Sequence, residues 1–339
     1  MGRVRQRGAR TLAFGLLLLA TVGPSADRGA IQRDNGAVVP DSFWSQALGI
    51  RKQLVVWLPP SYASATSRHY PVAYYLHGAW GSETDWSTAG HLPAVLDSLV
   101  AAGMPEMIVV MPDGDDGWYT TWNWLGDWAA CRRNPPRQNE AADHYCVPWP
   151  HYDDYIARDL VSYIDRHYRT RADRAHRGIA GLSMGGYGAI ALALAYPDVF
   201  AAAASHSGVV APLLGLSPAG DDTARYAPGI DELRGRYPRE LWALIAPAFG
   251  KDIAGWTARD PSRLARVLIA RSGVTPPELF LDCGADDPFL AQSRFFVRAA
   301  RATGLATTYA EWPGGHDWNY WRSHVSQSAS WIAARIGTQ

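Results

Sequence analysis

Short apolar segments alternate with helical patterns along this chain from about residue 53 onwards. The segments predicted as strands are 53–58, 72–76, 107–111, 177–180, 200–205, 278–283 and 307–312. The predicted helices between them are 92–102, 152–167, 184–196, 288–303 and 318–336. Several of the strands are apolar almost throughout, as is typical of strands covered on both faces. The alternation therefore predicts an α/β fold with a mostly parallel, doubly wound sheet and helices on both faces.

Two stretches interrupt this alternation. Residues 113–151 are rich in Trp, Gly, Asn and Pro and are too long for an ordinary connection. Residues 209–277 contain helical patterns but no clear strand, so they are expected to cover one end of the sheet. The chain shows neither internal repeats nor an interdomain linker. We predict one domain over residues 27–339, with two insertions.

The first 26 residues are typical of a secretory signal peptide. Arginines precede an apolar run at 12–22, and small residues suited to cleavage follow it up to Ala26. The run is shorter than a membrane-spanning helix requires. We expect a secreted or periplasmic protein with no stable membrane span after cleavage of the signal peptide. The 32 basic residues balance 32 acidic ones, which argues against a nucleic-acid partner; the sequence carries no signal for an oligomeric state.

An exported protein can contain disulfides, and this chain has three cysteines. Cys131 and Cys146 lie in one irregular segment and could close a short loop. Cys283 follows an apolar strand and is expected to be a buried small residue. Three cysteines cannot hold a fold by themselves, so a hydrophobic core must do so.

The segment Gly181-Leu182-Ser183-Met184-Gly185 matches the pattern G-x-S-x-G. It follows an apolar strand and opens an Ala-rich helix, which is the setting of a nucleophile elbow. In such an elbow the glycines allow the backbone to turn sharply, and the serine hydroxyl is exposed at a helix N-terminus. This setting predicts Ser183 as a catalytic nucleophile.

A serine hydroxyl needs a base, and the base needs a carboxylate that orients it. In this kind of site the chain order is serine, acid, histidine. Asp286 and Asp287 follow one late strand, and His316 follows the next. Since carboxyl ends of parallel strands share one edge of a sheet, these loops are expected to meet Ser183 there. We favour Asp287 over Asp286 as the acid, because it lies three residues after Gly284.

A tetrahedral intermediate also requires two hydrogen-bond donors for its oxyanion. The backbone N–H of Met184, directly after the nucleophile, is expected to be one. The second should come from a Gly-rich loop after an early strand, and His77-Gly78-Ala79-Trp80-Gly81 fits this description. We choose the Ala79 N–H, because Gly78 lets the chain turn inward. His77 is expected to be structural.

Aromatic residues are concentrated in the first insertion. They could form a flat wall for a sugar or a phenolic ester, or they could pack as ordinary core, and the sequence leaves both interpretations open. The candidates for such a wall are Trp80, Trp118, Tyr119, Trp122 and Trp124. The acidic run from Asp113 to Gly117 lacks the spacing of a calcium loop and is better explained as a turn. No residue set calls for a metal or an organic cofactor.

These motifs together resemble the esterase D, feruloyl-esterase and mycolyltransferase-like branch of the α/β hydrolases. The matching segments are Y-Y-L-H-G-A-W-G (74–81), V-V-M-P-D-G (109–114), Y-I-A-R-D-L (155–160), G-L-S-M-G-G-Y-G-A (181–189), D-C-G-A-D-D-P-F (282–289) and W-P-G-G-H-D-W (312–318). The resemblance implies an α/β-hydrolase fold with its insertions near the active-site edge. It also implies a Ser183–Asp287–His316 triad and an oxyanion hole at Ala79 and Met184.

The function that follows is hydrolysis of carboxylic esters by a secreted serine esterase. The expected substrates are small-molecule or polysaccharide-linked esters with carbohydrate, feruloyl or other phenolic, or short-chain acyl groups. One alternative is an acyltransferase of the mycolyltransferase type, which passes the acyl group to a sugar hydroxyl. Members of that type have Asp-Gly-Leu where this chain has His77-Gly78-Ala79, so we favour the esterase. A second alternative is a non-catalytic carbohydrate-binding protein on the same fold.

Overall fold

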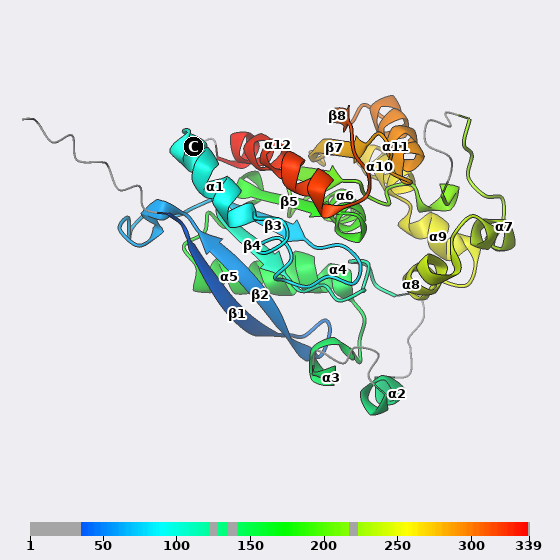
Figure 1. The fold of residues 1–339 in the computed structure, drawn as a ribbon, viewed down its shortest axis with the longest axis horizontal. Coiled ribbons are helices and arrows are strands. Elements are labelled where there is room, and N and C mark those ends of the chain that lie inside the picture. The colour runs from blue at the N-terminus through cyan, green and yellow to red at the C-terminus, as the bar shows by residue number, and fades with distance from the viewer. Residues whose placement is uncertain (1–34, 123–127, 135–140, 217–222, 338–339) are drawn as a thin grey trace, which may run out of the picture. The chain divides into compact units, whose positions relative to one another are not determined.

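The computed structural model describes residues 35–122, 128–134, 141–216 and 223–337 (Figure 1). The predicted signal peptide and Trp124 lie outside the described residues. All described residues belong to one unit, Asp34–Gln339.

The core of this unit is an eight-stranded sheet with the strand order β1-β2-β4-β3-β5-β6-β7-β8. The strands are β1 Ala37–Ser45, β2 Ile50–Leu58, β3 Val72–Leu76, β4 Ile108–Pro112, β5 Arg177–Leu182, β6 Ala202–His206, β7 Glu278–Gly284 and β8 Thr307–Trp312. The strands from β3 to β8 are parallel, whereas β1 and β2 are antiparallel to their neighbours. The mostly parallel, doubly wound sheet is thus confirmed.

Helices cover both faces of the sheet. Successive residues of β3 point to opposite faces, so Tyr74 and Tyr75 belong to different parts of the core. One face is covered by α1 (Leu92–Ala101) and α12 (Trp318–Ile336). The other face is covered by the run α4 (Tyr152–Asp154), η2 (Tyr155–Leu160, π-helical) and α5 (Val161–His167), and by α6 (Met184–Ala195), α10 (Pro261–Ile269) and α11 (Leu290–Ala302). Short 3-10 turns, η1 (Pro60–Tyr62) and η3 (Arg174–His176), complete the frame.

The insertions contain short helices where the structure describes them. The first contains α2 (Trp128–Arg133) and α3 (Ala142–Tyr145), and a disulfide joins Cys131 to Cys146. The second contains η4 (Pro212–Leu214), α7 (Ile230–Gly235), α8 (Arg239–Phe249), α9 (Ile253–Arg259) and α10, with no strand among its described residues. Cys283 is unpaired and buried.

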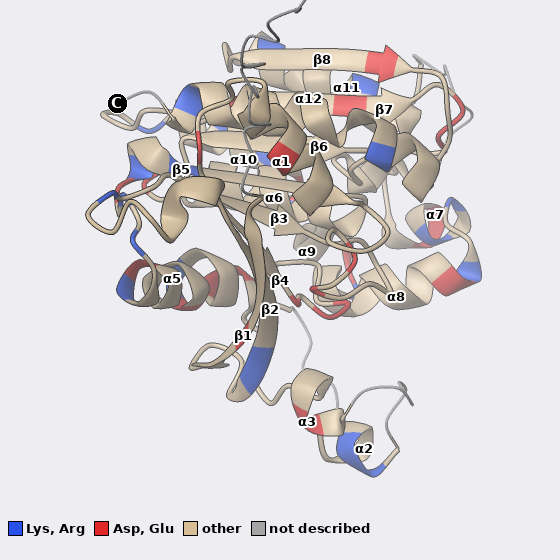
Figure 2. Ribbon diagram, turned by 60° about the vertical axis from the view of Figure 1, so that its left-hand side comes forward, with Lys and Arg blue, Asp and Glu red and all other residues tan. Residues whose placement is uncertain are grey.

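Charged residues of both signs are interspersed on the surface helices. Figure 2 shows acidic and basic residues together on α5 and on α7. None of the helices in the described part of the chain is long and apolar enough to cross a membrane.

Candidate active site

Ser183 stands between β5 and α6 in a backbone conformation that only a sharp turn imposes. Its φ of 53° lies in the left-handed region, which is uncommon for a residue with a side chain. The turn needs glycine on both sides of the serine. A Cβ on Gly181 would collide with the backbone of Gly185, and a Cβ on Gly185 would meet the carbonyl oxygens of Leu76 and His77. The G-x-S-x-G spacing therefore follows from the close approach of β3, β5 and α6.

His316 and Asp287 reach the serine from loops that follow β8 and β7. The His316 Nε2 lies 2.9 Å from the Ser183 Oγ, and its Nδ1 lies 2.9 Å from the Asp287 Oδ2. The carboxylate can only accept, so Nδ1 carries the proton and Nε2 offers its lone pair to the hydroxyl. Hydroxyl, imidazole and carboxylate thus form one hydrogen-bonded series in which the proton of Ser183 can pass to His316.

The two candidate carboxylates differ sharply in their surroundings. The Asp287 side chain is buried, and its Oδ1 accepts a second hydrogen bond of 2.8 Å from the backbone N–H of Phe289. Asp286 is exposed, and its backbone N–H donates to the Gly314 carbonyl. Only Asp287 has the fixed orientation that holding an imidazole requires.

The loop after β3 lies directly against the nucleophile. A Cβ on Gly78 would be 3.5 Å from the Cβ of Ser183. Neither the Ala79 nor the Met184 backbone N–H donates to any other described residue. Neither amide is therefore committed to a protein acceptor, a condition that an oxyanion donor must meet.

A cavity of about 240 Å³ opens above the serine. Its lining consists of Gly78, Ala79, Trp80, Asp85, Leu182, Ser183, His316, Trp318 and Trp321. Burial raises the pKa of Asp85, and hydrogen bonds from Ser82 oppose this shift. Asp85, Trp318 and Trp321 were not among the predicted site residues. The spacing of Trp318 and Trp321, two and five residues after His316 at the start of α12, could have indicated them.

The predicted aromatic wall is wrong for two of its members. Trp118 and Tyr119 are each only 1% exposed, because their rings fill the space between α6 and the insertions. Trp118 packs on the rings of Tyr187 and Phe249, with centroids 5.9 and 5.7 Å apart. For these residues the packing interpretation holds, and neither reaches the cavity.

The remaining described members of the wall differ in position. Trp80 is 71% exposed at the rim of the cavity, and its backbone N–H donates to Asp116 over 2.6 Å. Trp122 is half-buried, donates its indole N–H to the Gly117 carbonyl and does not line the cavity.

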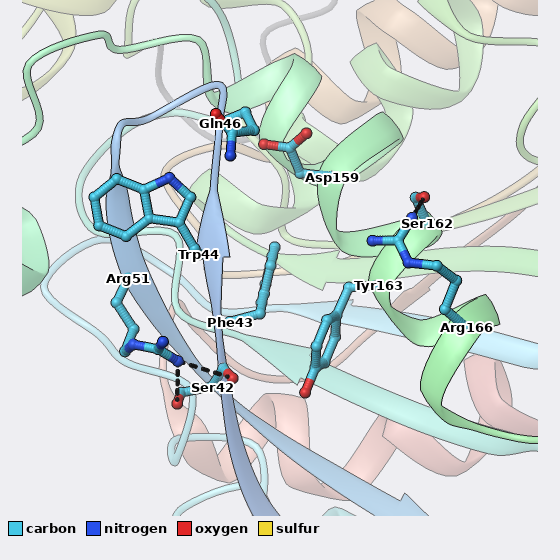
Figure 3. Close-up of a pocket in the computed structure, with 9 residues that line it drawn as sticks. All are labelled: Ser42, Phe43, Trp44, Gln46, Arg51, Asp159, Ser162, Tyr163 and Arg166. Atoms are coloured by element: carbon cyan, nitrogen blue, oxygen red, sulfur yellow. Dashed lines mark hydrogen bonds between the residues drawn. The ribbon is translucent and has the colours of Figure 1, made fainter.

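A larger cavity of about 450 Å³ lies between the β1–β2 hairpin and α5 (Figure 3). It contains no hydroxyl–imidazole pair, and its carboxylate, Asp159, already accepts from the Ser45 hydroxyl and the Ala47 backbone N–H. Tyr163 stacks on Phe43 in its wall, with centroids 4.8 Å apart. Of these two cavities, the smaller one thus contains the hydroxyl and the imidazole that a nucleophilic reaction needs.

Comparison with known proteins gives a consistent result. The family described as "Putative esterase" matches residues 45–332. An esterase of Mycobacterium tuberculosis is 28% identical over 279 residues, covering 81% of this chain and 54% of the relative, so the chain spans about half the length of that protein. An acetyl esterase of Caldicellulosiruptor saccharolyticus is 22% identical over 306 residues, covering 88% of this chain and 98% of that protein. The solved structure of a ferulic acid esterase superposes with a TM-score of 0.65 at 27% identity, covering 89% of this chain and 99% of that one.

Proposed function

This chain belongs to the esterase family and has the α/β-hydrolase fold of a carboxylic ester hydrolase, and on that basis we propose that it is a serine esterase with Ser183 as nucleophile. His316 acts as the base and Asp287 as the carboxylate that orients it. The observation that carries this proposal is the hydrogen-bonded series from Ser183 through His316 to Asp287, with 2.9 Å at each step.

Catalysis then proceeds in two half-reactions. His316 Nε2 takes the proton of Ser183 while the serine oxygen attacks the ester carbonyl carbon. The resulting imidazolium is stabilised by the buried Asp287, and it returns the proton to the departing alcohol. A water molecule, deprotonated by the same imidazole, hydrolyses the acyl-enzyme and releases the acid.

Charge develops on the carbonyl oxygen in each half-reaction. The Ala79 and Met184 N–H groups donate to this oxyanion, and each such donor is worth about 3 kcal/mol in comparable sites. Met184 also stands at the N-terminus of α6, whose dipole favours negative charge there.

The volume and lining of the cavity favour a substrate with a small acyl group beside a flat ring in the alcohol or the acyl part. It holds about 240 Å³, and three indole rings, Trp80, Trp318 and Trp321, line it. We propose short-chain acyl esters, phenolic esters such as feruloyl groups, and esters on carbohydrates as substrates, since flat aromatic surfaces stack on rings of these kinds. The relatives named as acetyl esterase and ferulic acid esterase support this range.

Export is part of the proposal. The basic and apolar N-terminal segment is typical of a signal peptide, and the disulfide between Cys131 and Cys146 fits an oxidising compartment.

Turnover of acetyl, butyryl, feruloyl and longer-chain esters by the wild type and by Ser183→Ala tests the proposal. We expect hydrolysis of at least one short or phenolic ester and a loss of nearly all turnover in the variant. A variant that retained wild-type turnover would refute Ser183 as nucleophile. Dominant acyl transfer to an added sugar, measured from the products, would identify an acyltransferase instead.

A further inference from the structure

A buried charged cluster lies beneath the loop that carries Ala79, and acyl transfer itself gives it no task. The Lys52 side chain is fully buried, and its Nζ lies 2.5 Å from the Asp113 Oδ2 and 2.9 Å from the Asp115 Oδ2. The ammonium also donates to the His144 carbonyl, and the Tyr152 hydroxyl donates to Asp115. Taking charges out of water is costly, so the stability of the fold does not by itself account for a cluster of this kind.

The geometry that the cluster fixes is the turn after β4. Within this turn the Asp115 backbone N–H donates to the Asp113 side chain over 3.0 Å, and the Tyr155 hydroxyl donates to the Asp113 carbonyl over 2.9 Å. The turn thereby presents the Gly114 backbone N–H to the imidazole of His77, 2.8 Å from its Nε2.

The imidazole of His77 in turn holds the oxyanion loop, residues 77–81, which carries the Ala79 amide. The Asp113 Oδ1 lies 3.5 Å from Nε2, but the Gly114 N–H is much closer and can only donate, so Nε2 accepts from it and Nδ1 carries the proton. Nδ1 lies 2.7 Å from the Gly78 carbonyl oxygen, which can only accept. The backbone N–H of Gly81 donates to the same oxygen over 3.2 Å. The Gly78 carbonyl is therefore held from two sides.

The Gly78 carbonyl and the Ala79 N–H are two ends of one peptide unit. Since that unit is planar and trans, its N–H points opposite to its C=O. A carbonyl fixed toward His77 and Gly81 thus directs the Ala79 N–H away from them. The Tyr119 hydroxyl fixes the preceding peptide, because it donates to the His77 carbonyl over 3.1 Å.

We propose that His77, held by Gly114 and the Lys52–Asp113–Asp115 cluster, is a positioning residue that aims the Ala79 amide at the oxyanion. This inference depends on the proposed function, since it assumes acyl transfer at Ser183. It assigns to the buried cluster and to Tyr119 the task of holding one oxyanion donor in place before substrate arrives.

Substitutions at His77 test the inference most sharply. His77→Leu removes both hydrogen bonds of the ring. His77→Asn keeps a side-chain N–H where Nδ1 stood, so it can still donate to the Gly78 carbonyl. Tyr119→Phe removes only the hydroxyl below the loop. Tyr70→Phe is the matched control, because Tyr70 is equally buried but bonds Ser61 ahead of β3, away from the loop.

The readouts are kcat and KM for a short-chain ester, the inhibition constant of a trifluoromethyl ketone that mimics the oxyanion, and the thermal midpoint of each purified variant. We expect His77→Leu to lower kcat about 100-fold, within the range for loss of one oxyanion donor. KM should stay within about twofold, and ketone binding should weaken in parallel with kcat. His77→Asn should recover about tenfold of the loss, and Tyr119→Phe should lower kcat about two- to tenfold. Tyr70→Phe should leave kcat within about twofold whatever its thermal midpoint.

A folded His77→Leu variant with wild-type kcat, or a His77→Asn variant no better than His77→Leu, would overturn the inference. If His77→Leu does not fold, His77→Asn and Tyr119→Phe decide: unchanged kcat and ketone binding in both would overturn it. Ser183→Ala separates this failure from that of the proposed function. Full activity in Ser183→Ala would refute the nucleophile, whereas an inactive Ser183→Ala beside fully active His77 variants would refute only the positioning role.

Discussion

Replacement of Asp287 by asparagine should disable the base without removing it. The Asp287 Oδ1 accepts from the Phe289 backbone N–H over 2.8 Å, so an asparagine must keep its oxygen there. Its NH₂ group then takes the place of Oδ2, 2.9 Å from the His316 Nδ1. A donor at this position forces the proton of the imidazole onto Nε2, which can no longer accept the proton of Ser183.

The expected loss follows from this change of tautomer. The same substitution in a comparable triad costs about 10⁴-fold in kcat, which corresponds to about 5–6 kcal/mol in activation free energy. Asp287 is buried, so solvent cannot restore the lost interaction. The side chains are nearly the same size, so we expect the Asp287→Asn variant to remain folded.

The assay is hydrolysis of 4-nitrophenyl acetate, with Asp286→Asn as the matched control. Asp286 is exposed and adjacent in sequence, and its replacement should change kcat/KM by no more than about twofold. An Asp287→Asn variant with a tenth or more of the wild-type kcat/KM would refute the tautomer argument. A greater loss in Asp286→Asn than in Asp287→Asn would show that the neighbouring residue orients His316.

Three further perturbations have defined outcomes. Gly185→Ala places a methyl group against the backbone at the end of β3, so it should lower the free energy of unfolding in urea by about 1–3 kcal/mol, and an unchanged value would contradict the close packing. Burial raises the pKa of Asp260 to about 6, so its folded form binds a proton more tightly and the free energy of unfolding should fall by up to about 3 kcal/mol as pH rises from about 4 to 6. Asp260→Asn keeps a capping side chain for α10, and its free energy of unfolding in urea should lack this part of the pH dependence. The same pH dependence in the variant and the wild type would contradict a raised pKa of Asp260. Replacing Cys131 and Cys146 by alanine opens a loop with a sequence separation of 15 and should lower the thermal midpoint, with a cost of about 3 kcal/mol or less; an unchanged midpoint would show that the segment unfolds independently.

The parallel strands could be predicted because burial on both faces requires nearly continuous apolar residues. The predicted strand at 72–76 coincides with β3, whose residues are all buried. The predicted strand at 307–312 coincides with β8, which is a partly exposed edge strand. Strand β1 was missed, because Pro40 and Asp41 interrupt its apolar pattern. Both residues are tolerated there because β1 is an edge strand paired only with β2.

The positions of the site residues could be predicted because each follows the carboxyl end of a strand. The choice between Asp286 and Asp287 depended on which carboxylate the turn directs inward, which the sequence did not settle. Composition also could not distinguish a core ring from an exposed one near the site. Trp118 is buried because Phe249, from the second insertion, packs against it, and such long-range packing leaves no local pattern.

The Lys52–Asp113–Asp115 cluster could not be predicted from the sequence for a similar reason. The acidic run after β4 indicated a turn, and it does form one. Its cation is the ammonium of Lys52, 61 residues before Asp113 in the chain. The predicted strand begins at residue 53, after this lysine, whereas β2 begins at Ile50.

The nucleophile can be identified by covalent labelling. Incubation of the intact protein with a fluorophosphonate, followed by peptide mass spectrometry, should find a single modified residue, Ser183, and loss of esterase activity in proportion to the label. Modification of another residue with Ser183 untouched, together with complete loss of activity, would contradict a reaction at this serine.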